Sequence, residues 1–316
     1  MGKKTVANII VAIVLLIVTV YIYMRLFHIT SVIFKTITPS VYDITMKRDI
    51  LCLFMAYPEY IADIVRDTDG KVFIVMKSGK HIIYDDMITK SFDGKLANPD
   101  LQDMMDQIYP ISHTNRLMPD NIDPGRFRVY ALLKEVYGST RKQVETNLIN
   151  VHIDNIYCIF SSKNGASDAL KAALSEIAYL MRNNPSIRQF VLPLGGTFNY
   201  RLIAGTNRLS AHSFGNAIDL ASNGRDYWQW CSKIDGEKRL EVYPKQIVAA
   251  FEKNGFIWGG KWAHFDIMHF EYRPEIILKA RYFSCEPAPE KPWHQGAPAD
   301  SEPALCFIKM INERID

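Results

Sequence analysis

The spacing of apolar residues predicts short helices and strands along most of the chain. Where apolar residues recur at helical spacing, we expect helices: at residues 101–109, 128–138, 166–181 and 244–255. Residues 30–68 are expected to be mostly helical as well. Short apolar runs predict strands at residues 189–194, 217–221 and 268–272. Two β-branched runs surround Ser78 and Gly79 within residues 71–86, a pattern typical of a β-hairpin.

The N-terminal region contains a long apolar run without any charged residue, from Val6 to Met24. A helix of about 20 apolar residues spans a hydrocarbon core of about 30 Å. The alternative is a cleaved signal peptide, but the run is long for one, and no Ala-x-Ala site follows in residues 25–28. We therefore expect an uncleaved, single-pass membrane anchor.

The composition is that of a folded protein. Of the 316 residues, 48% are hydrophobic and 22% are charged, which suits one large domain or two modest ones. The 37 basic and 34 acidic residues are well mixed, and the absence of a basic run or a nucleic-acid motif argues against a nucleic-acid partner.

The five cysteines are scattered without a CxxC pair, so they indicate neither a redox motif nor a metal site. Cys285 and Cys306 either bracket the Pro-rich tail as a disulfide or remain free thiols.

Two short stretches combine histidines with carboxylates, SAHSFGNAID at residues 210–219 and WGGKWAHFDIMHFEY at residues 258–272. A catalytic zinc site uses three protein ligands and keeps one position open. His212, Asp219 and a histidine of the second stretch would supply two rings and a carboxylate. Spacing alone does not choose between His264 and His269, and a chain with eight histidines also produces such spacings by chance.

The same stretches resemble the motifs of a known family. SAHSFGNAIDL resembles the SxHxxGxAxD motif of the zinc peptidases that include vancomycin-resistance type D-alanyl-D-alanine carboxypeptidases and L-alanyl-D-glutamate endopeptidases. FDIMHFE resembles their second motif, a carboxylate three residues before a His that is followed by Phe-Glu. Flanking stretches such as DPGRFR and GFIWGGKW extend the resemblance to roughly residues 93–282.

The resemblance implies a set of site residues. It implies Zn²⁺ as the cofactor, with His212, Asp219 and His269 as its ligands. It implies that Asp266 is the catalytic carboxylate, at a position where several members have Glu. A regular strand would place Asp266 and His269 on opposite faces, so this role requires a turn or bulge near residues 267 and 268. Glu271 shares a strand face with His269 and is the competing candidate for the base.

The remaining candidates surround this set. An arginine before the first motif binds substrate in the family; Arg201 is the first choice for this role and Arg208 the second. Ser210 and Glu271 are expected to support the site by hydrogen bonds, and Trp262 is expected to line a substrate groove.

The resemblance implies an α+β fold, in which a small antiparallel sheet carries the zinc site and helices pack on one side, here preceded by the transmembrane helix. We expect an anchor at residues 1–28, an extension with a β-hairpin at 29–92, a zinc peptidase domain at 93–284 and a Pro-rich tail at 285–316. The expected activity is hydrolysis of peptidoglycan stem peptides outside the cytoplasmic membrane, foremost as a D-alanyl-D-alanine carboxypeptidase. The alternatives are an L-Ala-D-Glu or crosslink endopeptidase and a non-catalytic cell-wall binding protein.

Overall fold

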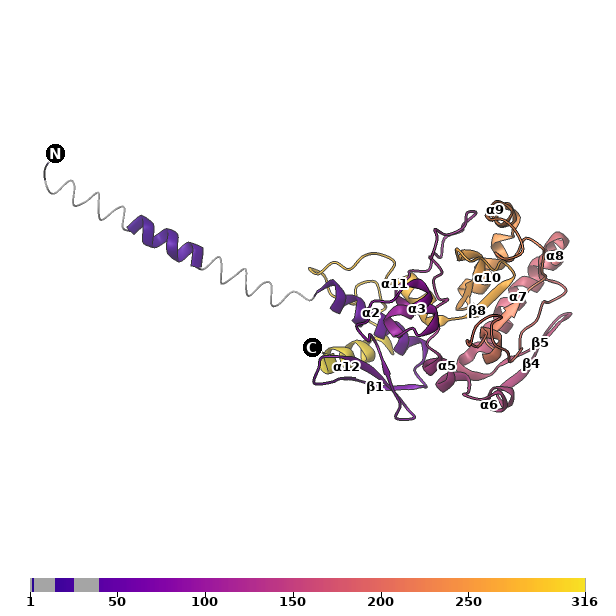
Figure 1. Ribbon diagram of the computed structural model, residues 1–316, viewed down its shortest axis with the longest axis horizontal. Coiled ribbons are helices and arrows are strands. Elements are labelled where there is room, and N and C mark those ends of the chain that lie inside the picture. Colours follow the sequence, from indigo (N-terminus) through magenta and orange to yellow (C-terminus); the bar gives the residue numbers. More distant parts are fainter. Residues whose placement is uncertain (1, 3–14, 26–39, 316) are drawn as a thin grey trace. The chain divides into compact units, whose positions relative to one another are not determined.

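The computed structural model describes residues 2, 15–25 and 40–315 of the chain (Figure 1). The chain divides into two compact units, Met1–Thr45 with Pro287–Trp293, and Met46–Glu286 with His294–Asp316. All the residues predicted to form the site lie in the second unit.

The described elements are helices and small antiparallel sheets, which confirms the expected α+β composition of the fold. The helices are α2 (Val41–Ala56), α3 (Phe92–Ala97), α4 (Leu101–Met105), α5 (Tyr130–Tyr137), α6 (Arg141–Thr146), α7 (Ala166–Asn183), α8 (Arg188–Val191), α9 (Lys233–Val242), α10 (Lys245–Lys253), α11 (Pro274–Tyr282) and α12 (Ala304–Ile315). The strands are β1 (Ile61–Arg66), β2 (Val72–Met76), β3 (His81–Ile83), β4 (Leu148–Ile153), β5 (Ile156–Ser161), β6 (Ala217–Asp219), β7 (Phe256–Trp258) and β8 (His269–Tyr272).

The sheet that carries the predicted site has the strand order β6-β8-β7 and is antiparallel throughout. Directly opposed residues of an antiparallel pair share a face. Asp219 faces His269, and Ala217 faces Glu271, so the polar residues gather on one face of the sheet. Ile218 and Trp258 both pair with Phe270 and form the other, apolar face.

The apolar face of this sheet is covered by α10, which follows from the sequence of that helix. Its apolar residues recur at helical spacing, and it is preceded by Pro244 and ends just before Gly255, whose φ is +85°. Phe251 of α10 stacks on Phe270 with ring centroids 4.1 Å apart. Helix α7 packs in turn against α10 and against β4 (Figure 1).

A second sheet, β1-β2-β3, lies in the same unit as the site sheet. Helix α12 packs on its strand β1, where Arg314 pairs with Asp63 at 2.9 Å and Arg66 donates to the carbonyl of Ile315 at 2.9 Å. On α11, Lys279 pairs with Asp49 at 2.6 Å. The part of the extension from residue 46 onward therefore packs with the rest of this unit, and the expected boundaries at 92/93 and 284/285 remain predictions.

Several predicted elements are confirmed. The hairpin forms between β2 and β3 with Gly79 in its turn. The predicted helices at 128–138, 166–181 and 244–255 correspond to α5, α7 and α10, and the predicted strands at 217–221 and 268–272 correspond to β6 and β8.

Two expectations about local structure are wrong. Residues 189–194 do not form a strand; the chain is helical in α8 up to Val191 and leaves that conformation before Pro193. Residues 61–66 form strand β1 rather than helix, because they pair with the hairpin strand β2. Within the Pro-rich tail, α12 occupies residues 304–315 and buries four apolar side chains.

The predicted anchor is only partly described. Residues 15–25 form a helix with exposed side chains, whereas residues 6–14 lie outside the described part of the chain. Over the ranges 15–25 and 40–315, we find no helix with the length and apolar character needed to cross a bilayer.

Candidate metal centre

The motif at residues 210–219 forms a sharp turn followed by a strand. Residues Ala211–Phe214 make a single 3-10 turn, Gly215 reverses the chain with a φ of +65°, and β6 begins at Ala217. A Cβ atom on residue 215 would lie 2.5 Å from the side chain of Leu148, so both the backbone conformation and the packing require glycine. The glycine thus brings His212 back over the strand that ends in Asp219.

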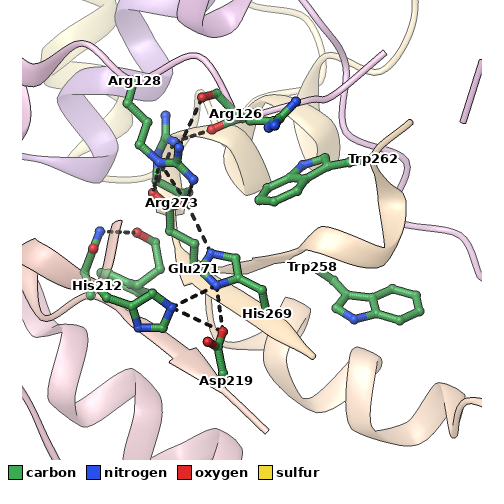
Figure 2. Close-up of polar contacts among 12 residues, drawn as sticks. Arg126, Arg128, His212, Asp219, Trp258, Trp262, His269, Glu271 and Arg273 are labelled. Atoms are coloured by element: carbon green, nitrogen blue, oxygen red, sulfur yellow. Dashed lines mark hydrogen bonds and ion pairs between the residues drawn. The ribbon is translucent and has the colours of Figure 1, made fainter. Parts of the chain in front are cut away.

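His212, Asp219 and His269 converge on one point of the second unit (Figure 2). Nε2 of His212 lies 3.2 Å from Oδ1 of Asp219 and 3.2 Å from Nδ1 of His269, which is itself 2.9 Å from Oδ1 of Asp219. One ligand atom from each residue falls within 4.8 Å of the other two. Two imidazoles and one carboxylate in this arrangement form a donor set suited to Zn²⁺.

The ring of His212 is oriented by the backbone. Its Nδ1 lies 2.7 Å from the carbonyl oxygen of Thr197. A carbonyl oxygen only accepts, so Nδ1 carries the hydrogen, and the lone pair of the neutral ring is on Nε2, which points toward Asp219 and His269. Such a bond to the far nitrogen is the usual support of a metal-binding histidine.

The ring of His269 is supported from the other side by Glu271. Nε2 of His269 lies 3.8 Å from Oε2 of Glu271. Glu271 is fully buried (0% exposed) and is held by Arg128, whose Nε and Nη2 donate to its two oxygens over 2.6–3.0 Å. A second guanidinium, that of Arg273, lies 3.5 Å from Oε1 of Glu271 (Figure 2).

The electrostatics of the triad favour a positive charge at its centre. Burial acts to raise the pKa of Asp219, but the hydrogen bonds from His212 and His269 outweigh it and hold this pKa well below its usual range. Burial acts to lower the pKa of His269, yet its contacts with Asp219 and Glu271 raise it to about 10. A divalent cation would take the place of the proton that the site otherwise holds, so the residues present fit a metal ion.

Asp266 stands beside the triad in the geometry that its predicted role requires. Residues 267 and 268 form a turn, closed by a hydrogen bond of 3.1 Å from the amide of His269 to the carbonyl of Asp266. Its Oδ1 atom is buried and has no hydrogen-bond partner in the described part of the chain. Burial, and to a lesser degree the charge of Asp219, raise the pKa of Asp266 to about 6.

Glu271 is poorly suited to act as the base. Burial acts to raise its pKa, but the charge of Arg128 and the contact with His269 outweigh it and hold this pKa well below its usual range. Both of its oxygens are already occupied by Arg128. The geometry therefore favours Asp266 for proton transfer and leaves Glu271 as a support of His269.

The two arginines proposed to bind substrate differ in their surroundings. Arg201 is exposed, and its backbone is tied to the 3-10 turn by Ser213 and Ser210. Arg208 is half-buried; burial lowers its pKa, as do the nearby positive charges of Arg126 and Arg128. Neither Arg201 nor Arg208 forms an ion pair with another residue of the described ranges, so the structure leaves both candidates open.

The remaining candidates fall into supporting positions. His264 lies outside the triad, because its Nδ1 is bound to Asp123 at 2.7 Å and its ring stacks on Phe92. Trp262 is buried rather than lining an open groove, and its ring centroid is 5.7 Å from that of His269. Ser210 shapes the turn, since its carbonyl accepts from the amide of Ser213 at 3.0 Å.

Sequence reasoning did not identify Arg128, Arg273 and Thr197, which hold the site together. Arg128 lies in the DPGRFR stretch, whose resemblance to the family was the available signal. Thr197 acts through its backbone carbonyl, so its side chain gave no signal.

The contrast between the two histidines of the second motif gives a first prediction. The full chain should purify with about one zinc ion. His269→Ala should abolish metal retention, because it removes one of three ligands, whereas His264→Ala should retain the metal. Elemental analysis after gel filtration measures both. Equal losses in the two variants would show that the triad is not the metal site.

The comparisons with known proteins agree with this geometry. Residues 204–272 match the family model described as D-alanyl-D-alanine carboxypeptidase. No curated protein and no solved structure matches the chain. The matched segment contains the triad, Asp266 and Arg208, and begins three residues after Arg201. The segment that carries both motifs is therefore similar to the D-alanyl-D-alanine carboxypeptidase family, which confirms the resemblance and supports a peptidase.

Proposed function

We propose that the protein is a zinc metallopeptidase that hydrolyses peptidoglycan stem peptides, foremost as a D-alanyl-D-alanine carboxypeptidase. The observation that carries the proposal is the convergence of His212, Asp219 and His269 inside the matched segment, with Asp266 beside them and its Oδ1 atom buried. An endopeptidase of the same family is the second candidate, because Asp266 is the shorter acid that the endopeptidase-like members also have.

The proposed roles follow from the contacts of each residue. His212, Asp219 and His269 would hold the zinc ion, which supplies a Lewis acid that activates water at neutral pH. Thr197 and Glu271 fix the two imidazole rings in the orientation that binding requires.

Peptide hydrolysis also requires a group that moves protons. The carboxylate of Asp266 accepts a proton from the attacking water and then gives it to the nitrogen of the leaving amine, which restores the carboxylate.

Mass spectrometry of defined stem peptides after incubation with the full chain tests the function. Loss of the terminal D-alanine from a pentapeptide that ends in D-Ala-D-Ala is the expected result. Cleavage within the stem or at a crosslink would instead establish the endopeptidase. Intact peptides at full zinc occupancy would overturn both and favour a non-catalytic cell-wall binding protein.

The role of Asp266 gives a second prediction. Asp266→Asn keeps the size of the side chain but removes its ability to carry a proton. It should bind zinc normally and lose on the order of 10²–10⁴-fold in turnover, the usual contribution of a general acid–base. Single-turnover kinetics at measured zinc occupancy give the comparison.

Glu271→Gln is the matched variant for this experiment. It should weaken zinc retention, because it leaves Arg128 without its carboxylate and His269 without its support. Near-normal turnover in Asp266→Asn, with a collapse in Glu271→Gln at full zinc occupancy, would move the proton-transfer role to Glu271.

Substrate anchoring gives a further prediction. A carboxypeptidase recognises a terminal carboxylate, which a guanidinium binds with two parallel hydrogen bonds that lysine cannot reproduce. Arg201→Lys should keep its zinc and lose much of its activity on peptides with a free C-terminus. If Arg208→Lys shows this loss and Arg201→Lys does not, the assignment is reversed.

We also propose that residues 6–24 anchor the protein in the cytoplasmic membrane with the catalytic unit outside, because the proposed substrate lies there. The uncharged apolar run supports this proposal. A C-terminal reporter that is active only outside the cytoplasm should be active. Activity of a cytoplasm-only reporter in the same position would contradict the topology.

A further inference from the structure

A pocket of about 480 Å³ lies against the supports of the metal centre. One wall is the β4–β5 hairpin and the other is the loop that ends at Thr197. The residues that line it are Asn150, Val151, His152, Tyr157, Cys158, Ile159, Leu194, Gly196 and Thr197. We propose that this pocket binds an N-acetylated sugar ring of the glycan to which the stem peptide is attached, an inference that rests on the proposed function.

The pocket shares its wall with two of the residues that would hold the metal. The carbonyl of Thr197 orients His212, and Gly196 accepts a hydrogen bond of 2.8 Å from the amide of Asp219. A ligand seated in the pocket therefore lies beside the backbone groups that orient His212 and Asp219.

The hairpin presents an aromatic surface to this pocket. His152 and Tyr157 are directly opposed in the register of β4 and β5, and their rings stack with centroids 4.1 Å apart. Tyr157 is 68% exposed, so its ring is accessible to a ligand in the pocket. Nε2 of His152 donates to the carbonyl of Asp154 at 2.6 Å, so the pair is held in place before any ligand arrives.

The chemistry of the lining favours a sugar over a peptide. No lysine, arginine, aspartate or glutamate is among the described residues that line the pocket. The carboxylates of a stem peptide would call for a guanidinium or ammonium partner, which this lining does not offer. A sugar ring instead presents a face of C–H groups to an aromatic ring, and its acetamido and hydroxyl groups match the amide of Asn150 and the free nitrogen of His152.

A binding experiment tests this inference without depending on catalysis. The probe is N,N′-diacetylchitobiose, a neutral disaccharide of N-acetylated sugars, titrated into the full chain and followed by calorimetry. Tyr157→Ala should weaken binding by about tenfold or more, the usual effect of truncating an aromatic anchor, and Asn150→Ala should weaken it less. Tyr179→Ala, which removes a ring that is 61% exposed on α7, is the matched control and should bind like the wild type.

The outcomes separate this inference from the proposed function. Absence of chitobiose binding by the wild type, or equal binding by wild type and Tyr157→Ala, would overturn the sugar site even if stem peptides are cleaved. Binding that depends on Tyr157 would support the sugar site even if no stem peptide is cleaved. A sugar-free stem pentapeptide that binds through Tyr157 more tightly than chitobiose would assign the pocket to the peptide and overturn the proposal.

Discussion

The buried ion pairs behind His269 are the constraint on which the rest of the site depends. Glu271 and Glu275 are fully buried, as is Arg273 between them, and Arg128 closes the group from the DPGRFR stretch. Moving such charges out of water is costly, and the cost is offset only when every charge has its partner. Removal of one partner from a buried pair typically costs about 3–5 kcal/mol. The four charged residues are therefore stable in this arrangement only together, and the position of His269 depends on all four being present.

The same constraint explains why residues before α3 pack against the ion-pair group. Glu275 receives a hydrogen bond of 2.7 Å from the hydroxyl of Tyr57, which follows α2. A buried carboxylate oxygen without a donor is unfavourable by roughly 1–3 kcal/mol or more, since the group has lost its water. Of this group only Glu271 lies inside the 204–272 segment that matches the family, so its partners and Tyr57 all come from other parts of the chain.

The sequence predicted those parts of the site whose chemistry lies in short motifs. The spacing of His212 and Asp219 encodes a turn and a strand, and the turn before His269 was required by the role of Asp266. The histidine of the second motif could be chosen only by the resemblance, because His264 and His269 differ in partners that are distant in sequence. His264 is bound to Asp123 and His269 to Asp219, and no local pattern reveals such contacts.

The errors in the fold have a related cause. A short apolar run such as residues 189–194 suits a buried helix and a buried strand equally well, and its surroundings decide between them. Residues 61–66 are a strand because they pair with β2, which the local pattern does not show. Arg128 and Arg273 were missed because an isolated arginine carries no signal of burial; only the fold shows that each faces a carboxylate.

The two carboxylates next to His269 show how the surroundings divide the chemistry between identical groups. Glu271 lies between two guanidinium groups, which keep it ionised and leave it no freedom to exchange a proton. The Oδ1 atom of Asp266 is buried without a hydrogen-bond donor, so desolvation works against the charge of this carboxylate, and its pKa rises to about 6. Pairs of titratable groups whose environments push their pKa values apart are how one site assigns separate roles to similar side chains. Glu271 therefore supports the ring of His269, while the raised pKa of Asp266 agrees with the proton-transfer role that we propose for it.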